Sequence, residues 1–196
     1  MTRRSTFALV GIALAASACA RANPEPAAQR ARERWETAPS RIAFITSERE
    51  SRGLSAEIRF GGPLGRSALL LQFPNEWRAR GVPRRAFLRL SPRAGSASAE
   101  TPVTIEAWRI SGPWQATLRS WSEKPSLAPP YARADVSPSP SQELRLDVSE
   151  IVRYAARNPE REFGIAVVAS GGDGPGATFS SGFAGGRAPR LELYLP

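Results

Sequence analysis

The C-terminal stretch Arg190-Leu191-Glu192-Leu193-Tyr194-Leu195 places a leucine at every second position, between charged residues and a tyrosine. Successive side chains of a β-strand point to opposite faces of a sheet, so this pattern predicts a strand with one buried face. The same alternation recurs in Leu54–Phe60, Ala86–Leu90 and Leu144–Val148. It predicts a protein built from several half-buried strands.

Two segments are instead apolar on both faces, Ala68–Phe73 and Phe163–Ala169, and are predicted to be central strands. Glycine and proline clusters, such as Gly81-Val82-Pro83 and Pro129-Pro130, are expected to separate the strands. One helix is expected between Asp147 and Asn158-Pro159, because this stretch has acidic and hydroxyl capping residues followed by an apolar stripe. Together these features predict an all-β protein, a jelly-roll-type β-sandwich with one short helix before the penultimate strands.

The N-terminus has the layout of a secretory signal peptide. A basic start, Met1-Thr2-Arg3-Arg4, precedes the apolar run Phe7–Ala16 and the small residues that end at Cys19, the only cysteine in the chain. A cysteine directly after the cleavage point resembles the lipobox of bacterial lipoproteins. The resemblance implies that residues 1–18 are removed and that Cys19 carries the lipid. A cleaved signal without lipid and an uncleaved anchor remain as alternatives, although a spanning helix needs about 20 apolar residues.

The rest of the chain is expected to form a flexible tether, residues 19–41, and one domain, residues 42–196. Trp35 is expected to pack on the edge of that domain, and a place at the lipid interface is the alternative. Ala20 after the cysteine resembles the signal for sorting to the outer membrane, which predicts a lipid-anchored protein of the bacterial cell envelope.

The charge of the chain does not point to a nucleic-acid partner. The formal net charge is +9, and Lys124 is the only basic residue that is not arginine. Acidic residues are interleaved with the arginines along the predicted strands, which indicates a solvated surface of mixed charge rather than a basic stripe.

No residue pattern indicates catalysis, a metal or a cofactor. The chain contains no histidine, and a lipidated Cys19 would leave no free thiol, so imidazole and thiol chemistry are absent. Strand glutamates such as Glu57, Glu106 and Glu123 are expected to be solvated partners of arginines. We therefore expect a protein that is not an enzyme, with no catalytic residues.

Aromatic residues give the only binding signal. Trp108, Trp114, Trp121 and Tyr131 lie within 24 residues, and sugar rings stack on exposed aromatic faces. The candidate ligand-binding residues are Trp114, Trp121 and Tyr131. The alternative is that Trp114 and Trp121 close one end of the sandwich as structural residues.

Several short motifs occur in an order that resembles the DNRLRE-domain family. They cover much of residues 54–196 and are, in chain order, Arg66–Phe73, Arg85–Leu90, Val103–Ile110, Gly112–Trp114, Ser120–Pro125, Leu146–Ser149, Phe179–Ser181 and Ala188–Leu191. The resemblance implies a jelly roll similar to carbohydrate-binding modules, of a kind found in surface and secreted proteins.

The sequence thus predicts a non-enzymatic, lipid-anchored envelope protein with a structural, adhesive or assembly role. A carbohydrate-binding lipoprotein that uses the aromatic residues of 108–131 is the alternative. The expected partners are the membrane, through the lipid anchor, and polysaccharide or other envelope proteins.

Overall fold

The computed structural model describes residues 33–48, 55–62, 65–93, 103–118, 120–136, 142–169, 176–182 and 185–196. The chain divides into two units, residues 1–30 and 31–196, and every described residue belongs to the second. The predicted signal peptide, Cys19 and most of the predicted tether lie outside the described residues.

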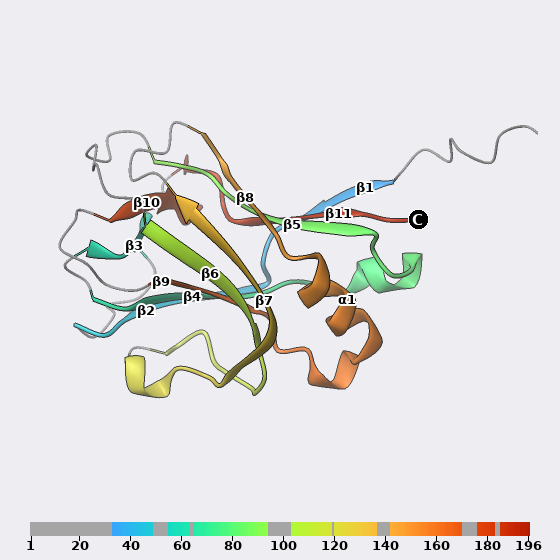
Figure 1. The fold of residues 1–196 in the computed structure, drawn as a ribbon, viewed down its shortest axis with the longest axis horizontal. Helices are drawn as coiled ribbons and strands as arrows, with labels where there is room; N and C mark the ends of the chain where they lie inside the picture. Colours follow the sequence, from blue (N-terminus) through green and yellow to red (C-terminus); the bar gives the residue numbers. More distant parts are fainter. Residues whose placement is uncertain are drawn as a thin grey trace, which may run out of the picture. The chain divides into compact units, whose positions relative to one another are not determined.

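The described strands form antiparallel sheets in two layers (Figure 1). We call the four-stranded sheet the front sheet and the five-stranded sheet the back sheet. The front sheet has the order β1 (Arg34–Thr37), β11 (Arg190–Tyr194), β5 (Arg85–Leu90), β8 (Leu144–Asp147). The back sheet has the order β2 (Arg41–Thr46), β4 (Ser67–Gln72), β9 (Ile165–Ala169), β6 (Val103–Ile110), β7 (Leu127–Val136). A third pair, β10 (Ala177–Ser180) and β3 (Glu57–Phe60), joins the end of β5 through a bridge between Pro92 and Phe179.

The chain crosses repeatedly between the two layers, from β4 to β5, back to β6 and β7, over to β8 and back to β9. Neighbours within a sheet are therefore distant in sequence: β1 lies beside β11, and β4 lies beside β9. This interleaved antiparallel order is that of a jelly-roll sandwich, so the predicted fold class is confirmed. The two segments predicted to be central, in β4 and β9, do lie inside the back sheet.

The main core fills the space between the layers. Leu71, Leu88, Ile105 and Leu193 are 0% exposed, and each comes from the inward face of its strand. The period of two in the sequence thus places one face of each strand in the core, which is the main stabilising contribution at about 25 cal/mol per Å² of apolar area buried.

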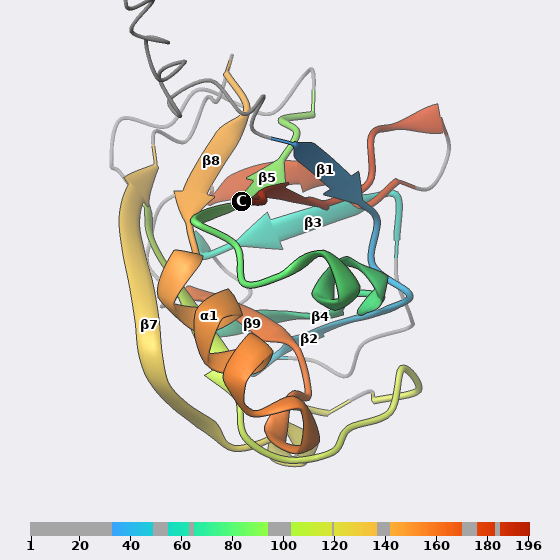
Figure 2. The same cartoon turned by 90° about the vertical axis from the view of Figure 1, so that its right-hand side faces the viewer.

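The predicted helix is α1 (Ser149–Arg157), which precedes β9, β10 and β11 as expected. The Asp147 carboxylate accepts the backbone N–H of Ser149 at 3.0 Å, and this interaction supports the first turn. Ile151 and Val152 are buried. Figure 2 shows α1 at one end of the sandwich, and the short 3-10 helix η2 (Glu76–Arg80) lies beside it.

At its centre, the outer face of the front sheet is not the solvated surface that its alternation predicts. Glu192 is only 3% exposed and lies opposite Glu36 on the neighbouring strand. Three arginines surround the Glu192 carboxylate, with N–O distances of 3.1 Å to Arg34, 3.6 Å to Arg89 and 3.4 Å to Arg145. We call these five residues the ionic cluster; its arginines offset the repulsion between two facing glutamates.

The predicted boundary of the tether at residue 41 is wrong. Strand β1 lies within residues 19–41 and pairs with β11 from Arg34↔Tyr194 to Thr37↔Leu191. Sequence alone missed it because its four residues carry no clear alternation, and partners on another strand hold it in place. The expected packing of Trp35 on the domain is confirmed: it contacts the main core, and the Arg80 guanidinium lies 4.3 Å from its ring centroid.

Candidate functional site

The outer face of the back sheet carries a second apolar cluster. Its buried members are Ala43, Ile45, Ala68, Leu70, Ile110, Trp114 and Ala166. Leu70 lies between Leu69 and Leu71 of the main core, so β4 buries both of its faces. The connection between β6 and β7 supplies part of this cover, through Trp114, Trp121 and Leu118.

Trp114 is a structural residue of this second cluster. It is 6% exposed, and its indole N–H donates to the Phe163 carbonyl at 2.6 Å. Arg41 donates to the Trp114 carbonyl at 2.9 Å, and its guanidinium lies 5.6 Å from the ring centroid. The indole N–H and the backbone carbonyl of Trp114 are thus both engaged, and its ring is too buried to offer a face to a ligand.

Trp121 is half-buried and packs against the same cluster. It begins the short helix η3 (Trp121–Glu123), which a capping box between Ser120 and Glu123 supports. The Lys124 ammonium lies 5.7 Å from its ring centroid, and burial lowers the pKa of that lysine. Trp121 therefore covers the outer face of the back sheet beside Trp114.

Tyr131 differs from the two tryptophans because it is 54% exposed. Its ring stacks on that of Trp108, with centroids 4.3 Å apart and planes 15° apart. Trp108 on β6 and Tyr131 on β7 lie directly opposite each other in the antiparallel ladder. Trp108 covers one face of the tyrosine ring, so the other face is free to contact a ligand.

The structure thus separates the predicted ligand-binding residues. Trp114 and Trp121 join the apolar cover, whereas Tyr131 pairs with Trp108, which the candidate set did not include. This pair could have been predicted from the sequence if residues 103–136 had been aligned as a hairpin, because that register places Trp108 opposite Tyr131. Pro129-Pro130 obscured it, because these residues suggest a turn but lie inside β7, at a register shift opposite Trp108 and Arg109. Prolines are tolerated there because β7 is an edge strand, and they are skipped by the ladder.

Polar side chains flank the stacked rings on the same face of the hairpin. The Trp108 indole N–H donates to the Glu106 carboxylate at 3.0 Å, and Arg133 lies opposite Glu106 in the ladder. Arg133 is exposed and has no ion-pair partner among the described residues. An aromatic ring beside a carboxylate and a guanidinium offers a stacking face together with hydrogen-bond partners for hydroxyl groups.

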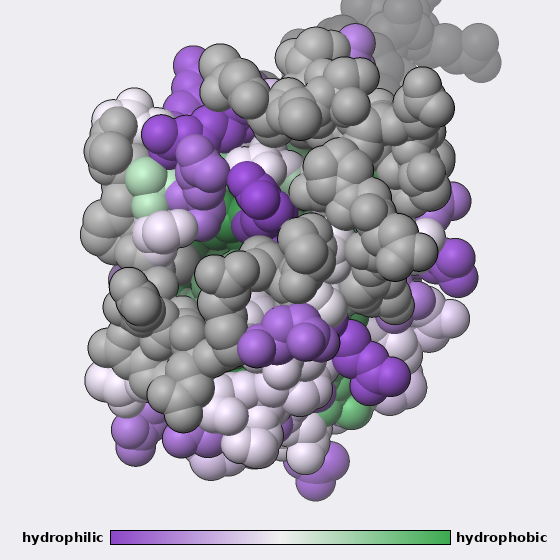
Figure 3. All heavy atoms as spheres, turned by 90° about the vertical axis from the view of Figure 1, so that its left-hand side faces the viewer, coloured by the Kyte–Doolittle hydropathy of each residue, from purple (hydrophilic) through white to green (hydrophobic). Residues whose placement is uncertain are grey.

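Little apolar surface is exposed elsewhere on the described part of the chain. Val82 and Tyr131 are its exposed large apolar side chains, at 44% and 54%. The face drawn in Figure 3 is mostly hydrophilic or neutral where it is described, and hydrophobic atoms show only in small areas. Tyr131 with Trp108, flanked by Glu106 and Arg133, is therefore the candidate binding surface; we call these four residues the aromatic platform.

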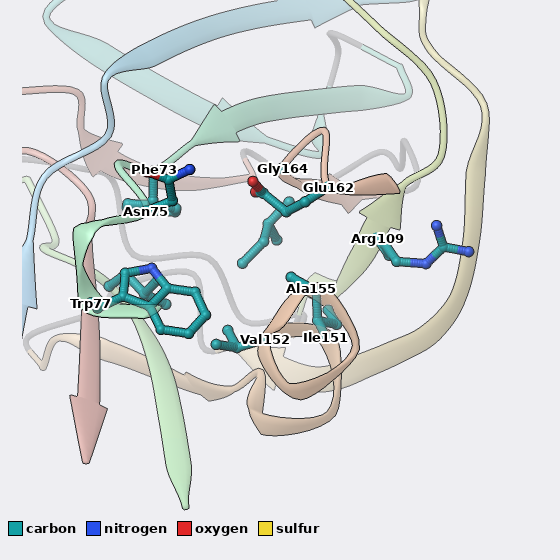
Figure 4. A pocket seen from close by; sticks show the side chains of 11 residues that line it. Phe73, Asn75, Trp77, Arg109, Ile151, Val152, Ala155, Glu162 and Gly164 are labelled. Carbon is teal, nitrogen blue, oxygen red and sulfur yellow. The ribbon is translucent and has the colours of Figure 1, made fainter. Parts of the chain in front are cut away.

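A small pocket lies between α1 and the end of the back sheet (Figure 4). Apolar side chains such as Phe73, Trp77 and Val152 line it, together with the Glu162 carboxylate. Burial raises the pKa of Glu162, and the charge of Arg78 at 3.1 Å partly offsets this effect. The cavity has a volume of about 20 Å³, room for about one water molecule, so this pocket belongs to the packing of the helix.

The carboxylates considered in the sequence have separate local partners. Glu57 pairs with Arg93 at 2.9 Å, Glu106 accepts from Trp108, and Glu123 accepts the Ser120 N–H at 3.2 Å. Among the described residues, no three His, Cys, Asp or Glu side chains lie together in an arrangement that could hold a metal ion. A search of the same residues finds no helix with the length and apolar character needed to span a membrane.

Neither family models nor curated proteins give a relative for the chain. No protein-family model matches it, and no curated protein matches its sequence significantly. The resemblance to the DNRLRE-domain family therefore stays a prediction.

Proposed function

We propose that this protein is a non-enzymatic, lipid-anchored component of the bacterial cell envelope with a structural or adhesive role. Residues 1–18 would be removed, and Cys19 would hold the sandwich at the outer membrane. The lone cysteine behind a signal-like segment is the observation that carries the proposal.

Acylation of Cys19 tests this proposal directly. Mass spectrometry of the membrane-bound form should find a chain that begins at Cys19 and carries acyl chains, because two or more such chains give stable membrane binding. Cys19→Ala should release the protein from washed membranes. A membrane-bound chain that retains residues 1–18 and has no acyl mass would contradict the proposal.

The aromatic platform favours a second candidate function, carbohydrate binding. The free ring face of Tyr131 can stack on the C–H face of a sugar, and Glu106 and Arg133 are placed beside it to bond hydroxyl groups. One stacking face and a few hydrogen bonds would give dissociation constants in the millimolar to micromolar range, roughly −4 to −8 kcal/mol. Envelope polysaccharide is the proposed ligand class.

Two tyrosine variants and one tryptophan variant distinguish a binding role from a structural one. Tyr131→Ala should abolish binding on an array of glycans and cell-wall polymers, and Tyr131→Phe should keep it because the ring face remains. Trp121→Ala should lower stability instead, by roughly 3 kcal/mol for a packed tryptophan. If no polymer on the array binds the wild-type protein, the structural role remains and the carbohydrate candidate is rejected.

A further inference from the structure

A shallow groove of about 350 Å³ runs beside the first turn of α1, between the start of β5 and the edge strand β7. Three arginines line it, Arg84, Arg85 and Arg153, together with Tyr131. Two carboxylates also line the groove, Asp147 and Glu150.

Both carboxylates already have partners within the protein. Asp147 accepts hydrogen bonds from the backbone N–H and the hydroxyl of Ser149, at 3.0 and 2.5 Å. Glu150 pairs with Arg153. Arg84 and Arg85 are exposed and have no ion-pair partner among the described residues. Their guanidinium groups are therefore available to an external anion, and a guanidinium binds phosphate oxygens in a bidentate manner.

These two arginines lie at the end of the sandwich where the chain enters the domain. Arg34 at the start of β1 is opposite Tyr194, and Tyr194 is opposite Arg85, so the three residues form one row across the front sheet. Figure 1 shows β1, the C-terminus and α1 at this end. Val82, one of the exposed large apolar residues, precedes Arg84 in the same loop.

The connection to Cys19 enters the domain at this end, because the first described strand is β1. Fourteen residues, 20–33, separate Cys19 from the start of β1. At most about 3.6 Å per residue, they span no more than about 50 Å. A lipid on Cys19 would therefore hold Arg84 and Arg85 within reach of the membrane surface, at a high effective concentration.

We propose that this end of the domain docks on anionic phospholipid, with lipid phosphates bound by Arg84 and Arg85. The inference rests on the proposed anchor at Cys19 for its biological setting, but the docking surface can be tested without the lipid. Tyr131 at the rim of the groove suits a membrane surface, since tyrosine has an apolar ring and a polar hydroxyl and is enriched at the level of lipid headgroups. Docking would fix the orientation of the sandwich relative to the membrane.

Vesicle sedimentation of the unlipidated mature chain, residues 19–196 with Cys19→Ala, tests the proposal. This chain keeps the whole unit 31–196. It should bind vesicles of phosphatidylethanolamine with phosphatidylglycerol at low salt and should not bind vesicles of phosphatidylcholine. Each arginine near an anionic surface raises the partition coefficient by about fivefold. The double variant Arg84→Gln/Arg85→Gln should therefore lower it by about 30-fold. Added salt should weaken binding, because it screens exposed charges.

A matched double variant separates a local site from net charge. Arg59 and Arg66 are also exposed and have no ion-pair partner among the described residues. They lie on β3 and just before β4 and do not line the groove. Arg59→Gln/Arg66→Gln removes the same charge and should change partitioning less than threefold. Equal losses in the two double variants would overturn the proposal, as would a failure of the wild type to bind the anionic vesicles.

Two further measurements keep this proposal distinct from the proposed function. Binding to an acidic polysaccharide instead of vesicles, lost in Arg84→Gln/Arg85→Gln, would assign the arginines to a glycan and overturn docking on lipid. Acylation of Cys19, read by mass spectrometry, decides the anchor independently of the vesicle result.

Discussion

Glu192→Gln tests how the outer face of the front sheet is held together. The substitution preserves the shape of the side chain and removes its charge. The carboxylate is 3% exposed, accepts a hydrogen bond from the Tyr194 hydroxyl and faces Arg34, Arg89 and Arg145. In the variant the arginines of the ionic cluster would lose their shared partner.

The magnitude follows from the burial of the cluster. Removing one partner of a buried ion pair costs about 3–5 kcal/mol, but solvent reduces this because the three arginine side chains are 51%, 21% and 45% exposed. Arg89 also keeps its pairs with Glu36 and Glu143. We therefore expect a loss of about 2–3 kcal/mol, which corresponds to a fall in Tm of about 5–10 °C for a domain of this size.

The effect should depend on pH in a defined direction. Burial alone would raise the pKa of Glu192, but the hydrogen bond from Tyr194 and the charges of Arg145 and Arg34 outweigh it and hold the pKa below its ordinary value. A carboxylate with a lowered pKa stabilises the folded state above its unfolded pKa of about 4.3, and this contribution is lost as the pH falls through the folded pKa. The difference between wild type and Glu192→Gln should therefore be full at neutral pH and vanish in acid.

Thermal denaturation followed by circular dichroism, at a series of pH values, measures this difference. Glu160→Gln is the matched control, because Glu160 is 68% exposed and its nearest arginine nitrogen is 3.8 Å away. Its Tm should stay within about 2 °C of the wild type. A Glu192→Gln variant as stable as the control at neutral pH, or a deficit that persists unchanged in acid, would refute the role given to the cluster.

Three other substitutions test the cores. Leu146→Asp places a charge at a site that is 4% exposed and should cost more than about 4 kcal/mol, seen as loss of the cooperative urea transition. Trp114→Phe removes the donor to the Phe163 carbonyl and should lower the free energy of unfolding by about 2–3 kcal/mol, seen as a lower urea midpoint. Gly164→Ala should be at least as damaging as Trp114→Phe, at about 3 kcal/mol or more, because Gly164 has a φ of +109° and a Cβ there would lie 2.2 Å from the Leu71 carbonyl oxygen. An unchanged midpoint for any of the three would show that its neighbours relax around the new side chain.

The sequence was enough to predict many of the strands and the sandwich class, but not β1 or the assignment of strands to layers. Alternation predicted strands at 190–195 and 86–90, and the apolar character of both faces of 68–73 predicted a central strand. The structure contains all three, as β11, β5 and β4. This succeeds because the direction of successive side chains along a strand is a local property with a period of two. The helix α1 was also predictable, since an apolar stripe is a local signal, although its N-cap is Val148, which makes no side-chain capping hydrogen bond, rather than Asp147 or Ser149.

Tertiary structure alone decided what each aromatic and charged residue does. Trp114 and Tyr131 are equally plausible ligand-binding residues in the sequence, yet one is buried against the back sheet and the other stacks, exposed, on Trp108. Glu192 occupies a position that alternation assigns to solvent, yet arginines from three other strands cover it. The physical reason is that cross-strand neighbours are set by register and topology, which bring together residues as far apart as Arg34 and Glu192. A local pattern fixes the face on which a side chain lies, and only the assembled sheets fix what covers that face.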